Sequence, residues 1–357
     1  MKLQPNLLLR LGFRQNARLR HFTGVGTSLV YREYGDPQKV IVRREDVIPK
    51  LKDDQVLVRM LAAPVNPADI NTVQGVYAVK PQLPSVPGNE GVGEVVEVGK
   101  NIESELQPGN YVIPRVNAFG TWRTHVVTTS SEIIKIPSDV DIAMAATIAV
   151  NPGTAYRMLK DFSPLNSGDT VIQNGANSAV GQAVIQIAAT LGVKTINVVR
   201  DRPAISVLKE HLTKLGATVV VTENELRKSE EVKSLPQPKL ALNCVSGQSG
   251  TEILRKLSPH GVMVTYGGMS RQPVTVPVGA FIFNNVTLRG FWMTHWNKEH
   301  FSHPKRHQML NELFQLAKTG GLQPPNHSLV PFSDYHIALK NAMPREGMLC
   351  KKQILIF

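Results

Sequence analysis

The residues most suggestive of chemistry lie in a turn of small residues between a β-prone run and a long apolar helix. The run Thr170–Ile172 enters this turn, and the helix begins near Ser178. Gly175 and Gly181 stand where a dinucleotide-binding turn needs space for backbone approach and for helix–strand packing. A helix N-terminus directs unpaired N–H groups and partial positive charge toward a pyrophosphate. The pattern therefore predicts a dinucleotide site, and an ordinary strand–helix turn is the alternative.

Three charged residues favour one dinucleotide over another. Arg200, Asp201 and Arg202 directly follow a second β-prone run, Lys194–Val199. Paired arginines suit a 2′-phosphate, whereas an acidic residue at this place usually meets an unphosphorylated ribose. We therefore favour NADPH, and Asp201 leaves NADH as an alternative.

The surrounding elements fit an α/β fold with a doubly wound parallel sheet. Strand-like runs alternate with helical stretches between residues 170 and 266, which is typical of this architecture. The runs are Thr170–Gln173, Lys194–Val199, Thr218–Val221, Lys239–Asn243 and Gly261–Tyr266.

The sequence before this region reads as mostly β. Short β-branched runs, separated by glycine and proline, predict strands at Lys39–Val42, Gln55–Leu61, Val92–Val98 and Trp122–Val127. Asn66 and Pro67 predict the start of one helix, with Asn66 as its cap. A second β-to-helix transition is expected at Asn151, and the chain ends in a strand-like run, Gln353–Phe357.

Composition is consistent with two cores. The chain has 357 residues, of which 42% are hydrophobic, and no apolar run approaches the length of a membrane span. The two cysteines, Cys244 and Cys350, argue against a disulfide framework and are expected to be buried thiols.

The N-terminal segment is basic. Residues 1–27 contain five Lys and Arg residues and no acid, so their removal lowers the formal net charge from +12 to +7. Arginines mixed with leucines in helical fashion predict a mitochondrial transit segment, with a disordered basic tail as the alternative. The remaining basic charge would attract phosphorylated substrates or acidic partners, and no specific nucleic-acid motif is evident.

Several motifs carry a family resemblance. They include Val65–Asn71, Gly75–Tyr77, Pro87–Gly91, Ala241–Val245 and Arg289–Trp292. Together they resemble the mitochondrial trans-2-enoyl-thioester reductases of the medium-chain dehydrogenase/reductase superfamily. The resemblance implies a GroES-like catalytic domain formed by residues 28–150 and 287–357, with a Rossmann domain, residues 151–286, inserted between them.

The resemblance also bears on metal binding. In zinc alcohol dehydrogenases a Gly-His-Glu motif supplies a histidine ligand, but this chain reads Gly88-Asn89-Glu90 at the same place. Both cysteines lie far downstream of the family's cysteine ligands. We interpret four late histidines as solvated surface: His295, His300, His303 and His307. We therefore expect no metal, and we favour reduction of an activated carbon–carbon double bond over alcohol oxidation.

The resemblance implies NADPH-dependent reduction of a trans-2-enoyl thioester, carried by CoA or acyl carrier protein, in mitochondrial fatty acid synthesis. The substrate then needs a proton, and the resemblance places the catalytic tyrosine at Tyr77. A tyrosine hydroxyl holds its proton at neutral pH and can donate it. By residue type alone, Tyr77 could equally be a packing aromatic.

The resemblance further implies a set of cofactor contacts distributed over both domains. These residues are Asn151, Asn177, Ser178, Ala179, Val180, Arg200, Asp201, Arg202, Tyr266, Gly267, Gly268, Met269, Phe291, Trp292, Met293, Thr294 and Lys352. It also implies a homodimer. Lys298, Lys305 and Arg306 could assist an anionic substrate, although an exposed basic helix is the ordinary explanation.

Two other functions remain open. A quinone or enone reductase of the same superfamily would also be zinc-free and NADPH-dependent. A scaffold that binds RNA or another protein is conceivable from the basic charge. Tyr77, the glycine-containing turn and the paired arginines count against the scaffold.

Overall fold

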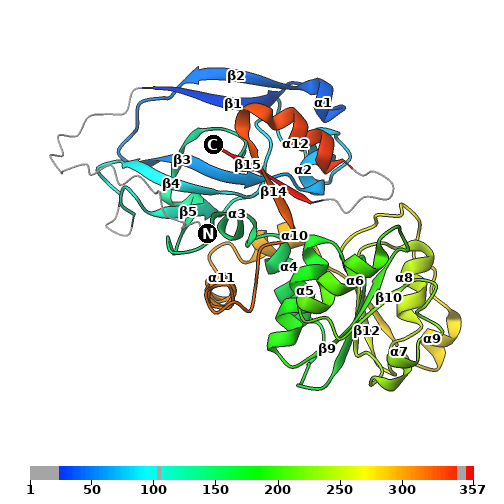
Figure 1. The fold of residues 1–357 in the computed structure, drawn as a ribbon. Helices are drawn as coiled ribbons and strands as arrows, with labels where there is room; N and C mark the ends of the chain where they lie inside the picture. Colours follow the sequence, from blue (N-terminus) through cyan, green and yellow to red (C-terminus); the bar gives the residue numbers. More distant parts are fainter. Residues whose placement is uncertain (1–23, 103–105, 344–350) are drawn as a thin grey trace, which may run out of the picture.

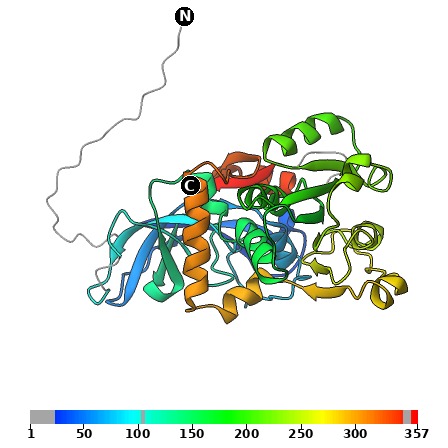
Figure 2. The same cartoon turned by 90° about the horizontal axis from the view of Figure 1, so that it is seen from below.

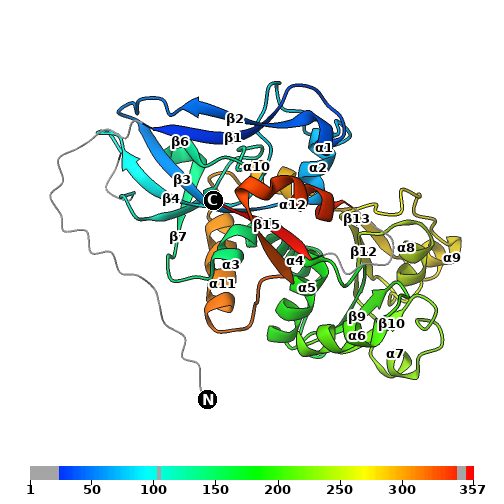
Figure 3. The same cartoon turned by 45° about the horizontal axis from the view of Figure 1, so that its top comes forward.

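The structure is a computed structural model that describes residues 24–102, 106–343 and 351–357. Two lobes lie side by side, with the start and the end of the chain in one and the middle in the other (Figures 1 and 3). A mixed sheet builds the first lobe and a parallel sheet the second. This arrangement confirms the predicted fold class.

The parallel sheet has the strand order β10-β9-β8-β11-β12-β13. Helices α5 and α6 pack with β9 on one face, while α7, α8 and α9 pack on the other. The strands are β8 Thr170–Asn174, β9 Lys194–Val199, β10 Val219–Thr222, β11 Leu240–Asn243, β12 Val262–Thr265 and β13 Thr287–Gly290. The helices are α5 Ala179–Thr190, α6 Ile205–Lys214, α7 Glu230–Ser234, α8 Gly247–Leu254 and α9 Val278–Ile282.

The first lobe contains a seven-stranded sheet in which the last strand of the chain, β15, pairs with β3. Its strands are β3 Gln55–Pro64, β4 Val92–Val98, β5 Tyr111–Pro114, β6 His125–Thr129, β7 Ile133–Ile136, β14 His327–Pro331 and β15 Lys352–Ile356. A separate hairpin joins β1 Val25–Tyr31 to β2 Ile41–Val47. The short helices are α1 Pro37–Val40, α2 Pro67–Val73, η1 Ser130–Glu132, α3 Ile142–Thr147, η2 Phe332–Asp334 and α12 Tyr335–Ala342.

Three helices connect the lobes: α4 Asn151–Asp161, α10 Met293–Glu299 and α11 Pro304–Lys318. Helix α11, the long orange helix in Figure 2, packs against α4. One continuous apolar core crosses the boundary, because Val92 of β4, Leu159 of α4, Val171 of β8 and Leu313 of α11 belong to the same buried cluster. The two lobes are therefore fixed to each other by packing.

The dinucleotide-type turn forms as the residues predict. The side chain of Ser178 caps α5 by accepting a hydrogen bond from the Gly181 backbone N–H at 3.1 Å. Gly175 has φ of +59°, a conformation that favours glycine. A Cβ at Gly181 would lie 2.6 Å from the backbone oxygen of Ala176. The two glycines thus permit the tight turn and the close approach of helix to strand.

Some boundaries differ from those expected. The run Lys39–Val42 is only partly a strand, because Asp36 caps the Gln38 backbone N–H and starts α1 at Pro37. Strand β6 begins at His125, three residues later than Trp122. The parallel sheet continues through β13 to Gly290, beyond the predicted domain end at residue 286.

Two predictions concern residues outside or at the edge of the described chain. The basic segment lies mostly in residues 1–23, outside the described residues, and β1 already begins at Val25. Cys244 is a buried free thiol, as expected, whereas Cys350 lies outside the described residues. Among the described residues, no helix combines the length and apolar character that a membrane crossing requires.

Candidate active site

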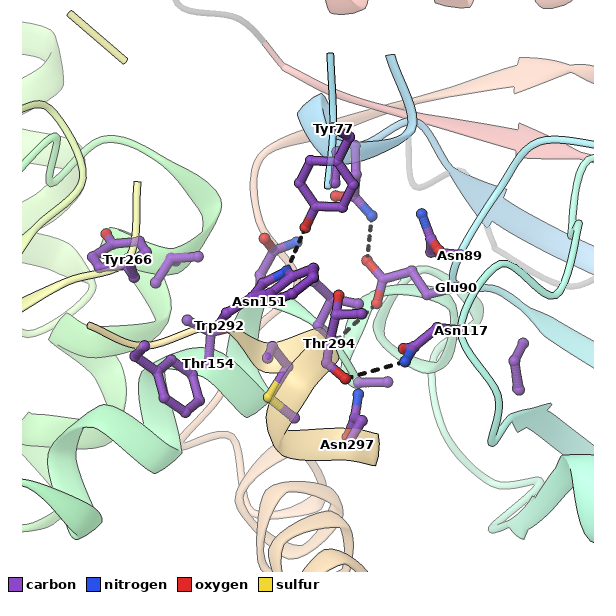
Figure 4. Close-up of a pocket in the computed structure, with 18 of the residues that line it drawn as sticks. Tyr77, Asn89, Glu90, Asn117, Asn151, Thr154, Tyr266, Trp292, Thr294 and Asn297 are labelled. Carbon is purple, nitrogen blue, oxygen red and sulfur yellow. Dashed lines mark hydrogen bonds between the residues drawn. The ribbon is translucent and has the colours of Figure 1, made fainter. Parts of the chain in front are cut away.

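A pocket opens between the two lobes, and Figure 4 shows its residues. The first lobe supplies the loop around Tyr77 and the segment Asn89–Glu90. The second lobe supplies Val180 and Tyr266, and α10 with its preceding loop closes the space between them. The remaining lining residues are Asn66, Ala68, Pro114, Val116, Asn117, Ala149, Val150, Asn151, Thr154, Phe291, Trp292, Met293, Thr294, Asn297 and Arg306.

Tyr77 is held at the rim of this pocket by Trp292. The indole Nε1–H donates a hydrogen bond to the Tyr77 hydroxyl oxygen at 2.7 Å. The two rings meet edge to face, with centroids 5.9 Å apart and planes at 85°. Because the tyrosine oxygen is the acceptor in this bond, its own proton remains available for donation into the pocket.

The other predicted contact residues gather at one edge of the parallel sheet. Asn177–Val180 follow β8, Arg200–Arg202 follow β9, Gly267–Met269 follow β12, and Phe291 follows β13. Carboxyl ends of parallel strands meet at the same edge, where α/β proteins bind dinucleotides. Residues that follow four strands therefore lie along one edge of the sheet, and Val180, Tyr266 and Phe291 join this edge to the pocket.

Two observations show that this surface fits a dinucleotide. The N-terminus of α5, a helix of 12 residues, faces the turn with its backbone N–H groups. In the pocket wall, Asn151 Nδ2 is buried and has no hydrogen-bond partner among the described residues. An unsatisfied buried polar atom is costly unless a ligand or water completes it. This atom is placed to bind a polar group of a bound nicotinamide, beside the ring of Tyr266 in the same pocket lining.

The charged segment after β9 is exposed to solvent at Arg200 and Asp201. Asp201 accepts the Arg202 backbone N–H at 2.8 Å, and Arg202 Nε donates to the Arg200 carbonyl at 3.3 Å. The carboxylate is thus engaged with its own turn. This geometry suits recognition of a 2′-phosphate by the two arginines.

A buried polar network lies beneath the pocket. Asn66, the cap residue of α2, donates from Nδ2 to Glu90 Oε1 at 2.8 Å. Its Oδ1 accepts a hydrogen bond from Lys352 Nζ of β15. The other oxygen of Glu90 accepts the Val150 backbone N–H at 2.9 Å, directly before α4 begins. Hydrogen bonds therefore run from the last strand of the chain to the first helix of the second lobe.

Asp69 extends this network. Its carboxylate accepts the Asn66 backbone N–H at 2.9 Å and two hydrogen bonds from Asn89, at 3.0 Å from the backbone and 2.6 Å from Nδ2. Burial raises the pKa of Glu90 to about 7 and that of Asp69 to about 6, and the Lys352 charge opposes both shifts. Burial also lowers the pKa of Lys352, against the pull of both carboxylates.

In the part of the chain that the structure describes, no group of three or more His, Cys, Asp or Glu residues lies close enough together to hold a metal ion. Asn89, at the place of the zinc-ligating histidine, instead binds Asp69 and accepts the Ala118 backbone N–H at 3.0 Å. This asparagine therefore has a structural role in shaping the pocket wall.

Known proteins match this chain over nearly its whole length. A family described as alcohol dehydrogenase GroES-like domain matches residues 52–138, and one described as zinc-binding dehydrogenase matches residues 179–311. The mitochondrial enoyl-(acyl-carrier-protein) reductase of Xenopus tropicalis is 51% identical over 333 residues, covering 92% of this chain and 94% of that protein. The human enzyme of the same name is 50% identical, covering 92% and 88%. This chain belongs to the mitochondrial enoyl-(acyl-carrier-protein) reductase family.

Solved structures agree with this membership. A complex of Etr1p with NADP and crotonyl-CoA has a TM-score of 0.86 and 36% identity, covering 93% of this chain and all of that one. An Etr1p/Etr2p heterodimer from Candida tropicalis, a mitochondrial 2-enoyl thioester reductase, has a TM-score of 0.86 and 35% identity at the same coverage. A putative NADPH:quinone reductase from Bacillus thuringiensis has a TM-score of 0.82 and 29% identity, covering 93% and 99%.

The pocket of this family member contains only some of the residues expected from the sequence. Those that line it are Tyr77, Asn151, Val180, Tyr266, Phe291, Trp292, Met293 and Thr294. Asn177, Ser178, Ala179 and the segments after β9 and β12 lie along the adjoining sheet edge. Lys352 lies in the polar network against Asn66.

Sequence reasoning does not identify Asn66 and Glu90 as lining residues, since it predicts only a helix cap for Asn66 and a motif without zinc for Glu90. For Arg306 it leaves two interpretations, assistance to an anionic substrate and an exposed basic helix. Only 4% of Arg306 is exposed and it lines the pocket, so the exposed helix surface is wrong for this residue. A clue was available in the sequence, because the apolar Met309 and Leu310 follow three and four residues later, on the same helix face.

Proposed function

We propose that this chain reduces trans-2-enoyl thioesters, carried by CoA or acyl carrier protein, to saturated acyl thioesters in mitochondrial fatty acid synthesis. Bound NADPH would supply the hydride for the β-carbon of the substrate. The observation that supports this reaction best is the Tyr77 hydroxyl, held by Trp292 at 2.7 Å at the rim of a pocket bordered by the dinucleotide surface.

The protein's own groups would perform the remaining tasks. Tyr77 donates its proton to the α-carbon of the substrate, while the Trp292 N–H keeps the phenol oriented and stabilises the oxygen as the proton leaves. Phe291 and Met293 present apolar surface to the pocket and exclude water from the reacting atoms. Asn151 and Tyr266 hold the nicotinamide end, and Arg200 with Arg202 holds the 2′-phosphate.

A paired assay tests this function. NADPH oxidation is measured with crotonyl-CoA and with a simple quinone, and the product of the first reaction is analysed by mass spectrometry after reaction in deuterium oxide. We expect faster reduction of crotonyl-CoA and one deuterium at the α-carbon of butyryl-CoA. Preference for the quinone would favour the alternative represented by the quinone reductase neighbour. Absence of NADPH binding would favour the scaffold.

We also propose that the chain forms a homodimer through the edge of its parallel sheet. Strand β13 ends the sheet order, and all four of its residues are exposed. Beside it, Ile282 is 67% and Phe283 81% exposed, and Leu288 within the strand is 38% exposed. An apolar patch next to an unpaired strand edge is typical of an interface. Sedimentation of Phe283→Glu, compared with the unaltered protein, should show a shift toward monomer.

A further inference from the structure

Arg306 is a buried cation in the candidate active site. It lies in the first turn of α11, is 4% exposed and lines the pocket. Its Nη1 is buried and has no hydrogen-bond partner, and among the described residues no carboxylate forms an ion pair with it. Burial of an unpaired guanidinium is unfavourable, because the charge loses its water without gaining a counter-ion.

The charged neighbours of Arg306 increase this cost. Burial, with a smaller contribution from the nearby Arg115, lowers the pKa of Arg306 to about 10. Arg115 is engaged elsewhere, since its guanidinium donates to the Ile133 and Phe301 carbonyls at 3.4 and 3.3 Å. On the same helix as Arg306, Glu312 accepts hydrogen bonds from Tyr156 and Gln308. Within residues 24–102, 106–343 and 351–357, Arg306 therefore has a repelling cation nearby and no carboxylate paired with it.

A second unsatisfied atom lies in the same pocket. Asn297 is 9% exposed, and its Oδ1 is buried without a partner. Figure 4 places Asn297 and Asn117 on the side of the pocket away from Tyr266, which marks the dinucleotide surface. Arg306 of α11 and Asn297 of α10 line the same cavity. Arg306 lies near Arg115, which stands between the lining residues Pro114 and Val116 of the first lobe. We name Arg306 and Asn297 the polar end of the pocket.

We infer that the polar end receives an anionic oxygen group, namely a carboxylate at the far end of a short enoyl chain. This inference rests on the proposed function and specifies its substrate class. The phosphates of a CoA or carrier arm belong at the open rim, where Trp292 is 39% exposed, whereas Arg306 is almost completely buried. The acyl tail is the part of the substrate that enters the interior.

The substrate class follows from hydrogen-bond satisfaction. A methyl-ended chain that reaches Arg306 would leave the guanidinium desolvated and unpaired. A carboxylate would accept its N–H groups in a charge-assisted pair, and a water between the carboxylate and Asn297 could donate to Asn297 Oδ1. Sites built around a buried charge discriminate strongly against analogues that leave the charge unpaired. The chain would thus favour ω-carboxylated trans-2-enoyl thioesters over methyl-ended ones of the same length.

The test compares two series of substrates. The kcat/KM is measured for trans-2-enedioyl-CoA and for methyl-ended trans-2-enoyl-CoA, each with five to eight carbons, in the unaltered protein, in Arg306→Met and in Lys305→Met. At one length or more, we expect Arg306→Met to lower the ratio of carboxylated to methyl-ended substrate at least tenfold. Lys305→Met removes the same charge from the exposed neighbouring position and should keep the original ratio.

The outcomes separate the two proposals. An unchanged ratio in Arg306→Met at every length overturns the polar end as a carboxylate site. Failure of the unaltered protein to reduce any enoyl-CoA overturns the proposed function instead. If Arg306→Met does not fold, calorimetry on the unaltered protein compares ω-carboxyacyl-CoA with acyl-CoA of equal length. Binding of the carboxylated form at least tenfold tighter at one length supports the site, and equal or weaker binding at every length refutes it.

Discussion

Two buried polar regions border the same pocket. They differ in whether their polar atoms have hydrogen-bond partners within the protein. In the network under the pocket, Asp69, Glu90 and Lys352 each have a protein partner. In the pocket wall, Asn151 Nδ2 and Arg306 Nη1 are equally buried and have none. Both regions are enclosed by the same two lobes, so burial alone does not distinguish them.

This difference separates structural from ligand-binding roles. Hydrogen bonds within the network offset part of the desolvation cost of its buried groups. They also fix Asn66 and Val150 relative to each other across the domain boundary, because both bind Glu90. The unsatisfied atoms of the pocket wall have no hydrogen bond to offset their desolvation, and a bound ligand would supply one. Substitutions in the network should therefore change stability, whereas substitutions of the unsatisfied wall should change binding or turnover and leave stability nearly unaltered.

The largest effect is expected at Tyr77. Tyr77→Phe removes the donated proton and the acceptor for Trp292, so kcat should fall about 100- to 1,000-fold, with NADPH affinity unchanged. Steady-state kinetics and fluorescence titration with NADPH measure the two quantities. Tyr34→Phe is the matched control, because its hydroxyl binds the Pro81 carbonyl at 3.0 Å in the same region but outside the pocket lining. A normal kcat in Tyr77→Phe would exclude this residue as the acid.

The next effect is on stability, at Lys352. Lys352→Met leaves Glu90 and Asp69 buried without their cation, which should lower the free energy of unfolding by about 3 kcal/mol. Urea denaturation followed by tryptophan fluorescence measures the change, and Lys351→Met at the exposed neighbouring position is the control. If Lys352→Met is as stable as the control but loses NADPH affinity, Lys352 is a cofactor contact rather than a member of the network.

A comparable effect concerns pH. Folding raises the pKa of Glu90 from 4.5 to about 7, so the folded state holds this proton more tightly than the unfolded state does. The stability due to this proton is present below pH 4.5 and is lost as the pH rises through 7. Relative to Glu90→Gln, the original protein should lose about 3 kcal/mol of unfolding free energy over this range. Parallel curves for the two proteins would contradict the shift.

The smallest effect is expected at Asn151. Asn151→Ala removes a buried atom that has no protein partner, so stability should change by less than about 0.5 kcal/mol. The KM for NADPH should rise about tenfold, which corresponds to the loss of one hydrogen bond of about 1.4 kcal/mol. Thermal denaturation without cofactor and NADPH titration measure these values. A strong loss of stability with normal NADPH binding would place Asn151 with the structural network instead.

Several local elements could be predicted from the sequence because their signals are short-range. The periodicity of Lys194–Val199 and Val92–Val98 matched β9 and β4 residue for residue. The predicted cap at Asn66 marked the start of α2, and the turn of small residues placed the start of α5 near Ser178. Capping and alternation act over a few neighbouring residues, so each can be recognised without knowledge of the rest of the chain.

The contacts of the site depend on residues far apart in sequence. Trp292 and Tyr77 are 215 positions apart, and Lys352 and Asn66 are 286 apart. Lys352 reaches Asn66 because β15 pairs with β3. Trp292 reaches Tyr77 because the loop before α10 lines the pocket between the lobes. No local pattern encodes this closure, which explains why Glu90 and Asn66 were not expected to share a network with Lys352.

The sequence by itself determined the alternation of strands and helices, the dinucleotide turn and the resemblance carried by the motifs, because these follow from side-chain type and near spacing. Only the tertiary structure decided which polar groups are satisfied. Arg306 shows the reason: the residue type predicts a charge in water, and burial depends on which distant surfaces pack around it. Long-range packing therefore decided which buried polar groups bond to one another across the domain boundary and which have no protein partner in the pocket wall.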